Sequence, residues 1–392
     1  MREVVIAGAA RTAIGKLGGA LSTVPVVDLG ATVMRAAIDR AGIEPESLDE
    51  VIMGQVIQAG AGPNPARQAI LTAGFPVTLP AYTVNKVCAS GMKAVALGYL
   101  SIASGEQDAI VAGGMENMSR APHILSQART GYRLGNGVVT DTILRDALED
   151  PILSRHMGTT AEALADEYGI ERVEQDEFAA SSQRKAGRAI SSGMFEREIV
   201  PVTVPGRHND IVFEVDEYPR PDTTVEVLSD LKPAFAVGGS VTAGNASGIN
   251  DGAAAMVLLA GEYAAKCRIS PMARIVSVAS SALEPERMGL GPVQATKLAL
   301  EKAGLKLSDI EAIELNEAFA SQSIAVIREI GADPDIVNVH GGAIALGHPV
   351  GATGARILVT LLHILLERNL KLGLATLCVG GGQGMAIVVE TI

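Results

Sequence analysis

Residues 36–54 read AAIDRAGIEPESLDEVIMG, and residues 298–316 follow the same pattern as LALEKAGLKLSDIEAIELN. Each segment places apolar residues at helical spacing, stops at an Ala-Gly pair, makes a short polar turn and ends in a strand-like run. Chance similarity between two Ala-rich segments is the simplest alternative. A second match in the same order along the chain is therefore needed to indicate a duplication.

A second pair of segments supplies that match. Residues 84–100 read VNKVCASGMKAVALGYL and precede DAIVAGG at 108–114, while residues 337–362 read VNVHGGAIALGHPVGATGARILVTLL and precede LATLCVGGG at 374–382. Each member has a strand, a glycine-rich turn, an apolar helix and a strand that ends in glycines. We therefore predict two similar α/β halves related by a pseudo-twofold axis.

The middle of the chain differs from both halves. It is charged and irregular, yet it contains two amphipathic stretches, TTAEALADEYG and EQDEFAASSQRKAGRAI, which favour an inserted domain over a flexible linker. SVTAGNASGINDGAAAMVLLA, at 240–260, then returns to the apolar style of the first half. The predicted division is an N-terminal half (1–117 plus 249–269), an inserted loop domain (118–248) and a C-terminal half (270–392).

The composition excludes several classes of protein. The net charge of −12 leaves no basic stripe for nucleic acid, and three widely spaced cysteines form neither a disulfide framework nor a zinc site. We expect no metal and a reducing compartment, which makes the cytoplasm the default location. We expect neither a signal peptide before the first strand nor an apolar run of membrane-spanning length.

Two residues stand out where a strand leads into a helix. Cys88 falls just before a helix, where the macrodipole would favour its thiolate, although a buried small hydrophobe is an equally good interpretation. His348 lies among glycines and before a proline, which favours a functional over a structural histidine. In the repeat these residues occupy equivalent segments, so we expect the imidazole to reach the thiol.

Two further positions lie at the ends of strands. Asn316 opens a helix in NEAFA, where a helix cap and a functional amide are equally plausible. Cys378 ends an apolar strand, and glycines at 380–382 leave backbone N–H groups open to a ligand. Strand ends of open α/β sheets form ligand crevices, so we expect both thiols, the imidazole and the amide in one site.

Five motifs in this order resemble the thiolase family, most closely its biosynthetic type: VCASGMKAV, AGNASGINDGA, NEAFA, GGAIALGHPVGATGAR and CVGGGQGMA. The resemblance covers essentially the whole chain. It implies the α/β thiolase fold, in which two similar βαβαβαββ halves pack as a five-layer α-β-α-β-α sandwich with an inserted loop domain. It also implies acetyl-CoA C-acetyltransferase activity, the reversible condensation of two acetyl-CoA to acetoacetyl-CoA and coenzyme A through an S-acetyl-cysteine.

The resemblance assigns a role to each motif. Cys88 matches the nucleophile, His348 the base that deprotonates it, and Cys378 the acid/base that removes the α-proton of the second acetyl-CoA. Asn316 holds a water that forms one oxyanion hole with His348, and the N–H groups of Cys88 and Gly380 form the other. Positions matched to the acyl and coenzyme A channel are Leu148, His156, Met157, Arg220, Ala243, Ser247, Met288, Ala318 and Phe319.

The same resemblance implies partners and leaves alternatives. Coenzyme A thioesters are the expected substrates, with no permanently bound cofactor, and the inserted domain is expected to bind coenzyme A and support a homotetramer built as a dimer of dimers. The alternatives are a 3-ketoacyl-CoA thiolase of broader chain length, a decarboxylating ketoacyl synthase, and a non-catalytic acyl-CoA binding protein. Cys378 and NEAFA argue against the synthase, which needs no base for an α-proton.

Overall fold

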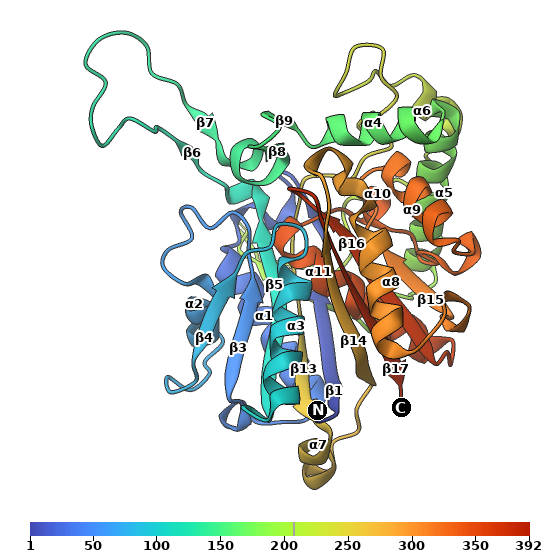
Figure 1. The fold of residues 1–392 in the computed structure, drawn as a ribbon. Coiled ribbons are helices and arrows are strands. Elements are labelled where there is room, and N and C mark those ends of the chain that lie inside the picture. Colours follow the sequence, from blue (N-terminus) through green and yellow to red (C-terminus); the bar gives the residue numbers. More distant parts are fainter. Residues whose placement is uncertain (207) are drawn as a thin grey trace.

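The computed structural model describes residues 1–206 and 208–392, and one mixed sheet runs through the molecule (Figure 1). Its strand order is β15-β16-β17-β14-β1-β13-β5-β3-β4, with the short strands β10 beside β1 and β2 beside β13. The N-terminal half consists of β1 (Val4–Thr12), β2 (Gly15–Lys16), α1 (Val26–Ala41), β3 (Glu50–Gly54), α2 (Pro65–Thr72), β4 (Ala81–Val84), α3 (Ser90–Ser104), β5 (Ala109–Asn117) and β13 (Asn250–Ala260).

The C-terminal half repeats this order after the linking helix α7 (Gly261–Cys267). It consists of β14 (Ala273–Ala282), the 3-10 helix η5 (Pro285–Leu290), α8 (Gly291–Ala303), β15 (Ala312–Leu315), α9 (Ala320–Ile330), α10 (Ala343–Leu346), α11 (Val350–Glu367), β16 (Leu372–Val379) and β17 (Gln383–Thr391). Its third strand is reduced to one parallel bridge between Ile313 and Val337. The first strand of each half is irregular at its fourth residue, Ala7 in β1 and Val276 in β14, which supports the predicted duplication.

The layers are helix, sheet, helix, sheet and helix, as predicted. Helices α1 and α2 cover the outer face of the first half, α8 and α9 cover the outer face of the second, and α3 and α11 lie between the two. Successive residues of one strand serve different layers: in β5, Val111 packs under α1 while Ile110 and Ala112 pack on the central helices. The two sheets are joined where β1 pairs with β14, which the repeat alone did not predict.

Glycines let the two central helices approach closely. A Cβ on Gly91 of α3 would lie 2.8 Å from the backbone nitrogen of Ala355, and one on Gly354 of α11 would lie 2.6 Å from that of Met92. Each helix thus presents bare backbone to the first turns of the other. The turns that precede α3 and α11 are consequently brought together at one end of the molecule.

The expectation that no apolar run reaches membrane-spanning length is wrong. Two segments pass that test by length and composition, Val87–Ser104 and Val350–Glu367, and 61% and 83% of their residues are buried inside the molecule. They are α3, with the turn before it, and α11. Their apolar length is explained by burial between two sheets, which is nearly complete along α11 and partial along α3, whose Leu100 is 51% exposed.

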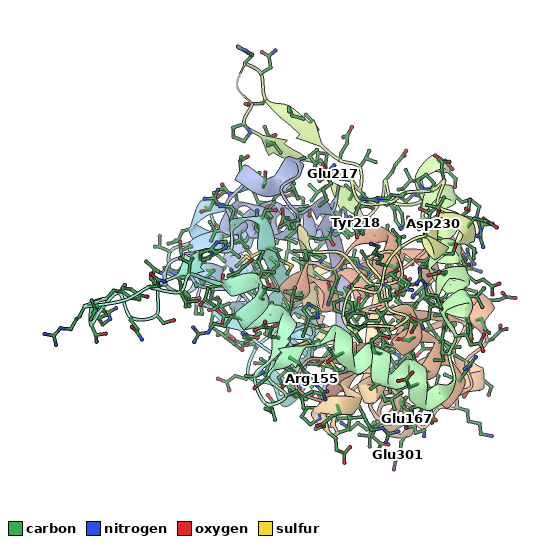
Figure 2. All side chains as sticks on the ribbon, turned by 90° about the horizontal axis from the view of Figure 1, so that it is seen from above. Arg155, Glu167, Glu217, Tyr218, Asp230 and Glu301 are labelled. Carbon is green, nitrogen blue, oxygen red and sulfur yellow. The ribbon has the colours of Figure 1, made fainter. Side chains whose placement is uncertain are left out.

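The segment between β5 and β13 covers one end of both halves. It contains β6 (His123–Ile124), β7 (Thr140–Asp141), β8 (Glu149–Asp150), β9 (Arg155–His156), α4 (Gly158–Tyr168), α5 (Arg172–Ser191), β10 (Ile199–Val200), β11 (Val202–Val204), β12 (Ile211–Phe213) and α6 (Val225–Ser229). The remaining single turns of helix are η1 (Ala20–Thr23), η2 (Pro45–Ser47), η3 (Met118–Arg120), η4 (Leu144–Leu148), η6 (Leu307–Asp309) and η7 (Pro334–Ile336). Seen from above, the β6–β7 arm and the β11–β12 hairpin leave the body in different directions (Figure 2).

Candidate active site

Cys88 lies in the turn between β4 and α3, two residues before the helix begins. The preceding residue, Val87, has a φ of +47°, which is strained for a β-branched side chain. The hydroxyl of Ser90 stabilises this turn: it donates to the carbonyl of Val87 at 2.6 Å and accepts from the N–H of Lys86 at 2.9 Å. The strand-to-helix turn was predicted, but the strain at Val87 was not.

Cys378 lies one residue before the end of β16 and faces away from the central layer. Its neighbours Leu377 and Val379 pack on the central helices, so alternation along the strand directs Cys378 towards the inserted segment. The thiol is 1% exposed. It therefore lies on the same side of the sheet as α4 and η5.

Gly380 connects the two cysteine turns. A Cβ at this position would lie 2.4 Å from Cε of Met157 and 3.3 Å from Cγ1 of Val87, so only glycine lets these segments meet. The backbone N–H of Gly380 lies close enough to the sulfur of Cys88 to act to lower the pKa of that thiol. The structure therefore brings the predicted nucleophile and the predicted oxyanion-hole donor into contact.

Both thiols are harder to ionise than a free cysteine. Burial raises the pKa of Cys88 to about 11, although the N–H groups of Gly380 and of Cys88 itself oppose the shift. Burial also raises the pKa of Cys378, and the nearby charge of Cys88 raises it further. The position before α3 therefore does not give Cys88 the lowered pKa that we expected, because burial outweighs the two N–H groups that favour the thiolate.

His348 is held as a neutral base. Its Nδ1 lies 2.6 Å from Oγ1 of Thr353, and that hydroxyl donates to the carbonyl of Pro349 at 2.9 Å. The hydroxyl must then accept from Nδ1–H, which leaves Nε2 as the proton acceptor. Burial, together with the positive charge of Arg356, lowers the pKa of His348 to about 3. The backbone N–H of His348 is fixed by Oδ1 of Asn250 at 2.9 Å.

Asn316 is not a helix cap. Helix α9 begins at Ala320, its N-cap is Phe319, and no side chain caps it. The N–H of Asn316 donates to the carbonyl of Thr376 on β16 at 3.0 Å. Its side chain is fully buried, and neither Oδ1 nor Nδ2 has a hydrogen-bond partner within residues 1–206 and 208–392. An unpaired buried amide beside a strand end is suited to a polar ligand.

An apolar wall packs against Cys378. Its members are Met157, Ala161, Val241, Ala246, Met288, Ala318 and Phe319, with Phe235 packed against them. Aromatic rings extend this wall: His156 stacks on Phe235 at 4.6 Å between ring centroids, and Phe235 meets Phe319 edge-on at 5.9 Å. The wall gives the thiol a dry surface that fits a small apolar group.

Comparison with known proteins identifies the relatives of this fold and site. The family model described as thiolase, N-terminal domain, matches residues 4–262, and that described as thiolase, C-terminal domain, matches residues 269–391. The chain belongs to the thiolase family. An Escherichia coli (strain K12) protein named acetyl-CoA acetyltransferase is 57% identical over all of both chains.

Two further relatives place this thiolase in its family. A Staphylococcus aureus (strain COL) protein named probable acetyl-CoA acyltransferase is 52% identical over 100% of this chain and 99% of that protein. The crystal structure of the Bacillus anthracis acetyl-CoA acetyltransferase superimposes with a TM-score of 0.98 at 47% identity, covering 100% of this thiolase and 99% of that chain.

The positions matched to the coenzyme A channel fall into separate groups. Met157, Met288 and Phe319 lie on the wall with Ala318, and the N–H of Ser247 donates to the carbonyl of Ala318 at 2.9 Å. Leu148 packs in a different cluster, and its carbonyl accepts from the N–H of Met157 at 2.8 Å. Arg220 and Ala243 are exposed and lie outside the wall. Their coenzyme A contacts stay predictions.

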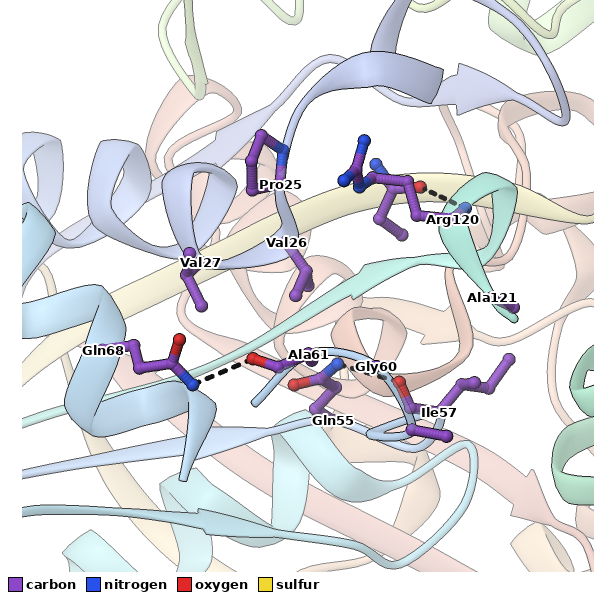
Figure 3. Close-up of a pocket in the computed structure, with 12 residues that line it drawn as sticks. Pro25, Val26, Val27, Gln55, Ile57, Gly60, Ala61, Gln68, Arg120 and Ala121 are labelled. Carbon is purple, nitrogen blue, oxygen red and sulfur yellow. Dashed lines mark hydrogen bonds between the residues drawn. The ribbon is translucent and has the colours of Figure 1, made fainter. Parts of the chain in front are cut away.

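Sequence reasoning missed Phe235, which bridges His156 and Phe319 in this thiolase. The signal available was its scarcity, because the chain has only six phenylalanines and no tryptophan. A cavity of about 200 Å³ lies elsewhere, between the start of α1, the loop after β3 and Arg120 (Figure 3). Its lining residues, which include Gln55 and Ile57, contain none of the predicted catalytic residues.

Proposed function

We propose that this thiolase is an acetyl-CoA acetyltransferase that condenses two acetyl-CoA to acetoacetyl-CoA and coenzyme A, reversibly and by a ping-pong route. One observation carries the proposal: Gly380, two residues after Cys378, packs on Val87 of the Cys88 turn with its N–H near the Cys88 sulfur, which joins the turn of one thiol to the strand end of the other. The names of the relatives in Escherichia coli and Bacillus anthracis support the same activity.

The first half-reaction transfers the acetyl group to Cys88. Nε2 of His348 takes the thiol proton as the sulfur attacks the thioester carbonyl, and the N–H groups of Cys88 and Gly380 stabilise the oxyanion. The tetrahedral intermediate collapses, coenzyme A leaves, and the departing sulfur takes the proton from His348. The product is again a thioester, so the step is close to isoenergetic and reverses easily.

The second half-reaction forms the carbon–carbon bond. Cys378 gives its proton to Nε2 of His348 and, as thiolate, removes a proton from the methyl group of the second acetyl-CoA. The enolate oxygen accepts from His348 Nε2–H and from the water that we assign to Asn316. The enolate carbon attacks the acetyl group on Cys88, and the released sulfur recovers the proton from His348, so all charges balance.

A short acyl chain is favoured over a long one. Met157, Met288 and Phe319 are at most 9% exposed and pack in one cluster with Cys378, which favours a small acyl group over a long alkyl chain. A 3-ketoacyl-CoA thiolase of broader range is the second candidate, supported by the acyltransferase name of the Staphylococcus aureus relative.

Assembly and location are further parts of the proposal. The β6–β7 arm exposes Leu125, Tyr132, Leu134, Val138 and Val139, an apolar set that suits contact with another copy in a homotetramer. Two unpaired buried thiols suit the reducing cytoplasm, where the product would enter lipid and fatty acid metabolism. Light scattering of the intact chain against a chain with a shortened arm tests the assembly.

Kinetics across chain length test the activity. Purified protein should cleave acetoacetyl-CoA with coenzyme A at a kcat/KM at least about tenfold higher than that for 3-ketoacyl-CoA of six or more carbons. One extra methylene group in a tight pocket typically changes kcat/KM by about tenfold or more. The purified protein should also carry label from radioactive acetyl-CoA. Equal rates for all lengths would favour the broader thiolase, and tight binding without label transfer would favour a non-catalytic binding protein.

A further inference from the structure

Glu317 follows Asn316 directly, and its carboxylate ties together three segments around the site. It is 2% exposed. It accepts from Oγ of Ser182 on α5 at 2.7 Å, from Nδ2 of Asn338 at 2.8 Å and from the N–H of Ile344 on α10 at 3.2 Å. Since these segments are far apart in the chain, the carboxylate fixes them relative to one another.

The partners of Glu317 are themselves fixed. Asn338, with a φ of +46°, pairs its amide with both backbone groups of Leu315, the last residue of β15, at 2.8 Å each. The N–H of Gly342 donates to Oγ of Ser182 at 3.0 Å, and a Cβ on Gly342 would lie 2.2 Å from the carboxylate carbon of Glu317. The carboxylate therefore packs on bare backbone in the loop that leads to His348.

The amide of Asn316 depends on this arrangement because only its backbone holds it in place. Its side-chain atoms have no hydrogen-bond partner in the described residues, so the position of the amide is set by the backbone of residues 315–317. On one side that backbone is anchored by the N–H of Asn316 on Thr376. On the other side the anchor is the carboxylate of Glu317.

We infer that Glu317 is a positioning residue that fixes the amide of Asn316 opposite His348 and thereby serves the carbon–carbon bond-forming step but not the acetyl transfer. The inference rests on the proposed function, in which Asn316 acts only in the second half-reaction. His348 has anchors of its own, Asn250 and Thr353. Loss of the Glu317 contacts should therefore separate the two half-reactions.

The test compares Glu317→Gln with the wild-type protein in two assays. Exchange of label between acetyl-CoA and free coenzyme A reports acetyl transfer, and thiolysis of acetoacetyl-CoA reports carbon–carbon cleavage as well. The glutamine keeps the shape of the side chain but sets an N–H against Asn338 or Ile344. We expect thiolysis kcat to fall on the order of 10- to 100-fold, as for other small misplacements in active sites, with KM and the exchange rate within about threefold of wild type.

Ser323→Ala is the matched control. Ser323 is buried on α9, and its hydroxyl donates to nearby residues of the same segment, the carbonyl of Phe319 at 3.0 Å and Oε1 of Gln322 at 3.5 Å. Its replacement should leave both assays unchanged. An equal fall of both activities in Glu317→Gln, an unchanged thiolysis rate, or the same loss in Ser323→Ala would overturn the inference.

A second variant covers a failure of Glu317→Gln to fold, judged by circular dichroism. Ser182→Ala removes one of the three donors and should lower thiolysis about threefold without changing exchange, in keeping with the loss of one hydrogen bond; an unchanged ratio of the two activities would overturn the inference. A wild-type protein inactive in both assays would overturn the proposed function as well. An active wild type with an unaffected Glu317→Gln would overturn the inference alone.

Discussion

The turns before α3 and α11 occupy the same place in the two halves yet carry different chemistry. Cys88 lies two residues before Ser90, where α3 begins, and His348 lies two residues before Val350, where α11 begins. The two helices cross at Gly91 and Gly354, so their preceding turns converge. Duplication thus explains how Cys88 of one half and His348 of the other come to the same end of the molecule.

The backbone of the two turns differs, and this difference explains why equivalent turns carry different chemistry. Before α3, the left-handed residue is Val87, and the Ser90 hydroxyl stabilises it. Before α11, it is Gly347 with a φ of +104°, where a Cβ would lie 2.5 Å from Cγ of Asn250. The turn before α11 packs closely on the side chain of Asn250. Oδ1 of Asn250 accepts from the N–H of His348 and so orients the backbone of that residue. Equivalent folds therefore set the place of a residue, and local contacts set its chemistry.

The largest expected effect comes from removing the thiol of the first turn. Cys88→Ala should lower acetyl transfer by at least about 10⁴-fold, as losses of other covalent nucleophiles do, because no second group can form the acyl-enzyme. Loss of protein-bound label from acetyl-CoA measures this. Cys267→Ala, which changes the exposed third cysteine, is the control and should behave as wild type. Persisting label in Cys88→Ala would show that the equivalence of the turns has no catalytic meaning.

The strands that end beside these turns offer a second comparison. Cys378 pairs with Gly384, and at the corresponding place in the first half Met115 pairs with Ala253. Met115 packs in the apolar core under α1, where its Sδ would lie 2.5 Å from a Cβ on Gly30. Cys378 faces the inserted segment instead. The same strand position holds a core residue in one half and the proposed base in the other, because different elements cover it.

Removal of Cys378 should separate the half-reactions in the same sense as the Glu317 variant but more strongly. Cys378→Ala should keep the acetylation of Cys88 within about tenfold and lower condensation by about 10²- to 10⁴-fold, the usual contribution of a general base. Label transfer and condensation rates measured on the same preparation check this. Equal losses in both would mean that Cys378 only packs the site, as Met115 does in its half.

A smaller effect is expected where the two halves meet. Gly354→Ala adds a methyl group against the backbone of Met92 and should destabilise the fold by about 1–3 kcal/mol, as overpacking of a tight core does. The midpoint of chemical denaturation measures the change, and Ser104→Ala on the exposed end of α3 is the control. An unaffected midpoint would show that the crossing of α3 and α11 is looser than the structure indicates.

The sequence predicted the fold through its repeat and the site through motifs at strand ends. The α/β class and the two halves follow from patterns that local physics determines, namely apolar spacing and glycine stops, whereas the five layers followed from the resemblance to the thiolase family. The motifs placed Cys88, Cys378, His348 and Asn316 correctly at the ends of elements. Whether Asn316 caps a helix was not predictable, because that depends on where α9 begins relative to β15, which tertiary contacts decide.

The ionisation of the site was not predictable from sequence at all. The position of Cys88 before α3 suggested a thiolate, but its burial depends on how closely Gly380 and Met157 pack on the turn. In the same way, the tautomer of His348 depends on the hydroxyl of Thr353. That this hydroxyl donates to the carbonyl of Pro349, and so must accept from His348, can be seen only in the structure. The nearby residues were visible in the sequence, but their distances were not.

The smallest expected effect is that the rate of acetylation of Cys88 hardly changes with pH. With the pKa of His348 near 3 and that of Cys88 near 11, both groups are neutral between these values. Proton transfer from thiol to imidazole then forms an ion pair without net uptake or release of protons, so the rate of acetylation should change by less than about twofold from pH 5.5 to 8.5. If a freely titrating thiolate were the nucleophile instead, the rate below its pKa would rise about tenfold per pH unit.

Single-turnover acetylation of the protein by acetyl-CoA distinguishes the two slopes. A steep rise would mean that the first turn activates its thiol alone and that the convergence of the two halves at His348 is not what makes Cys88 reactive.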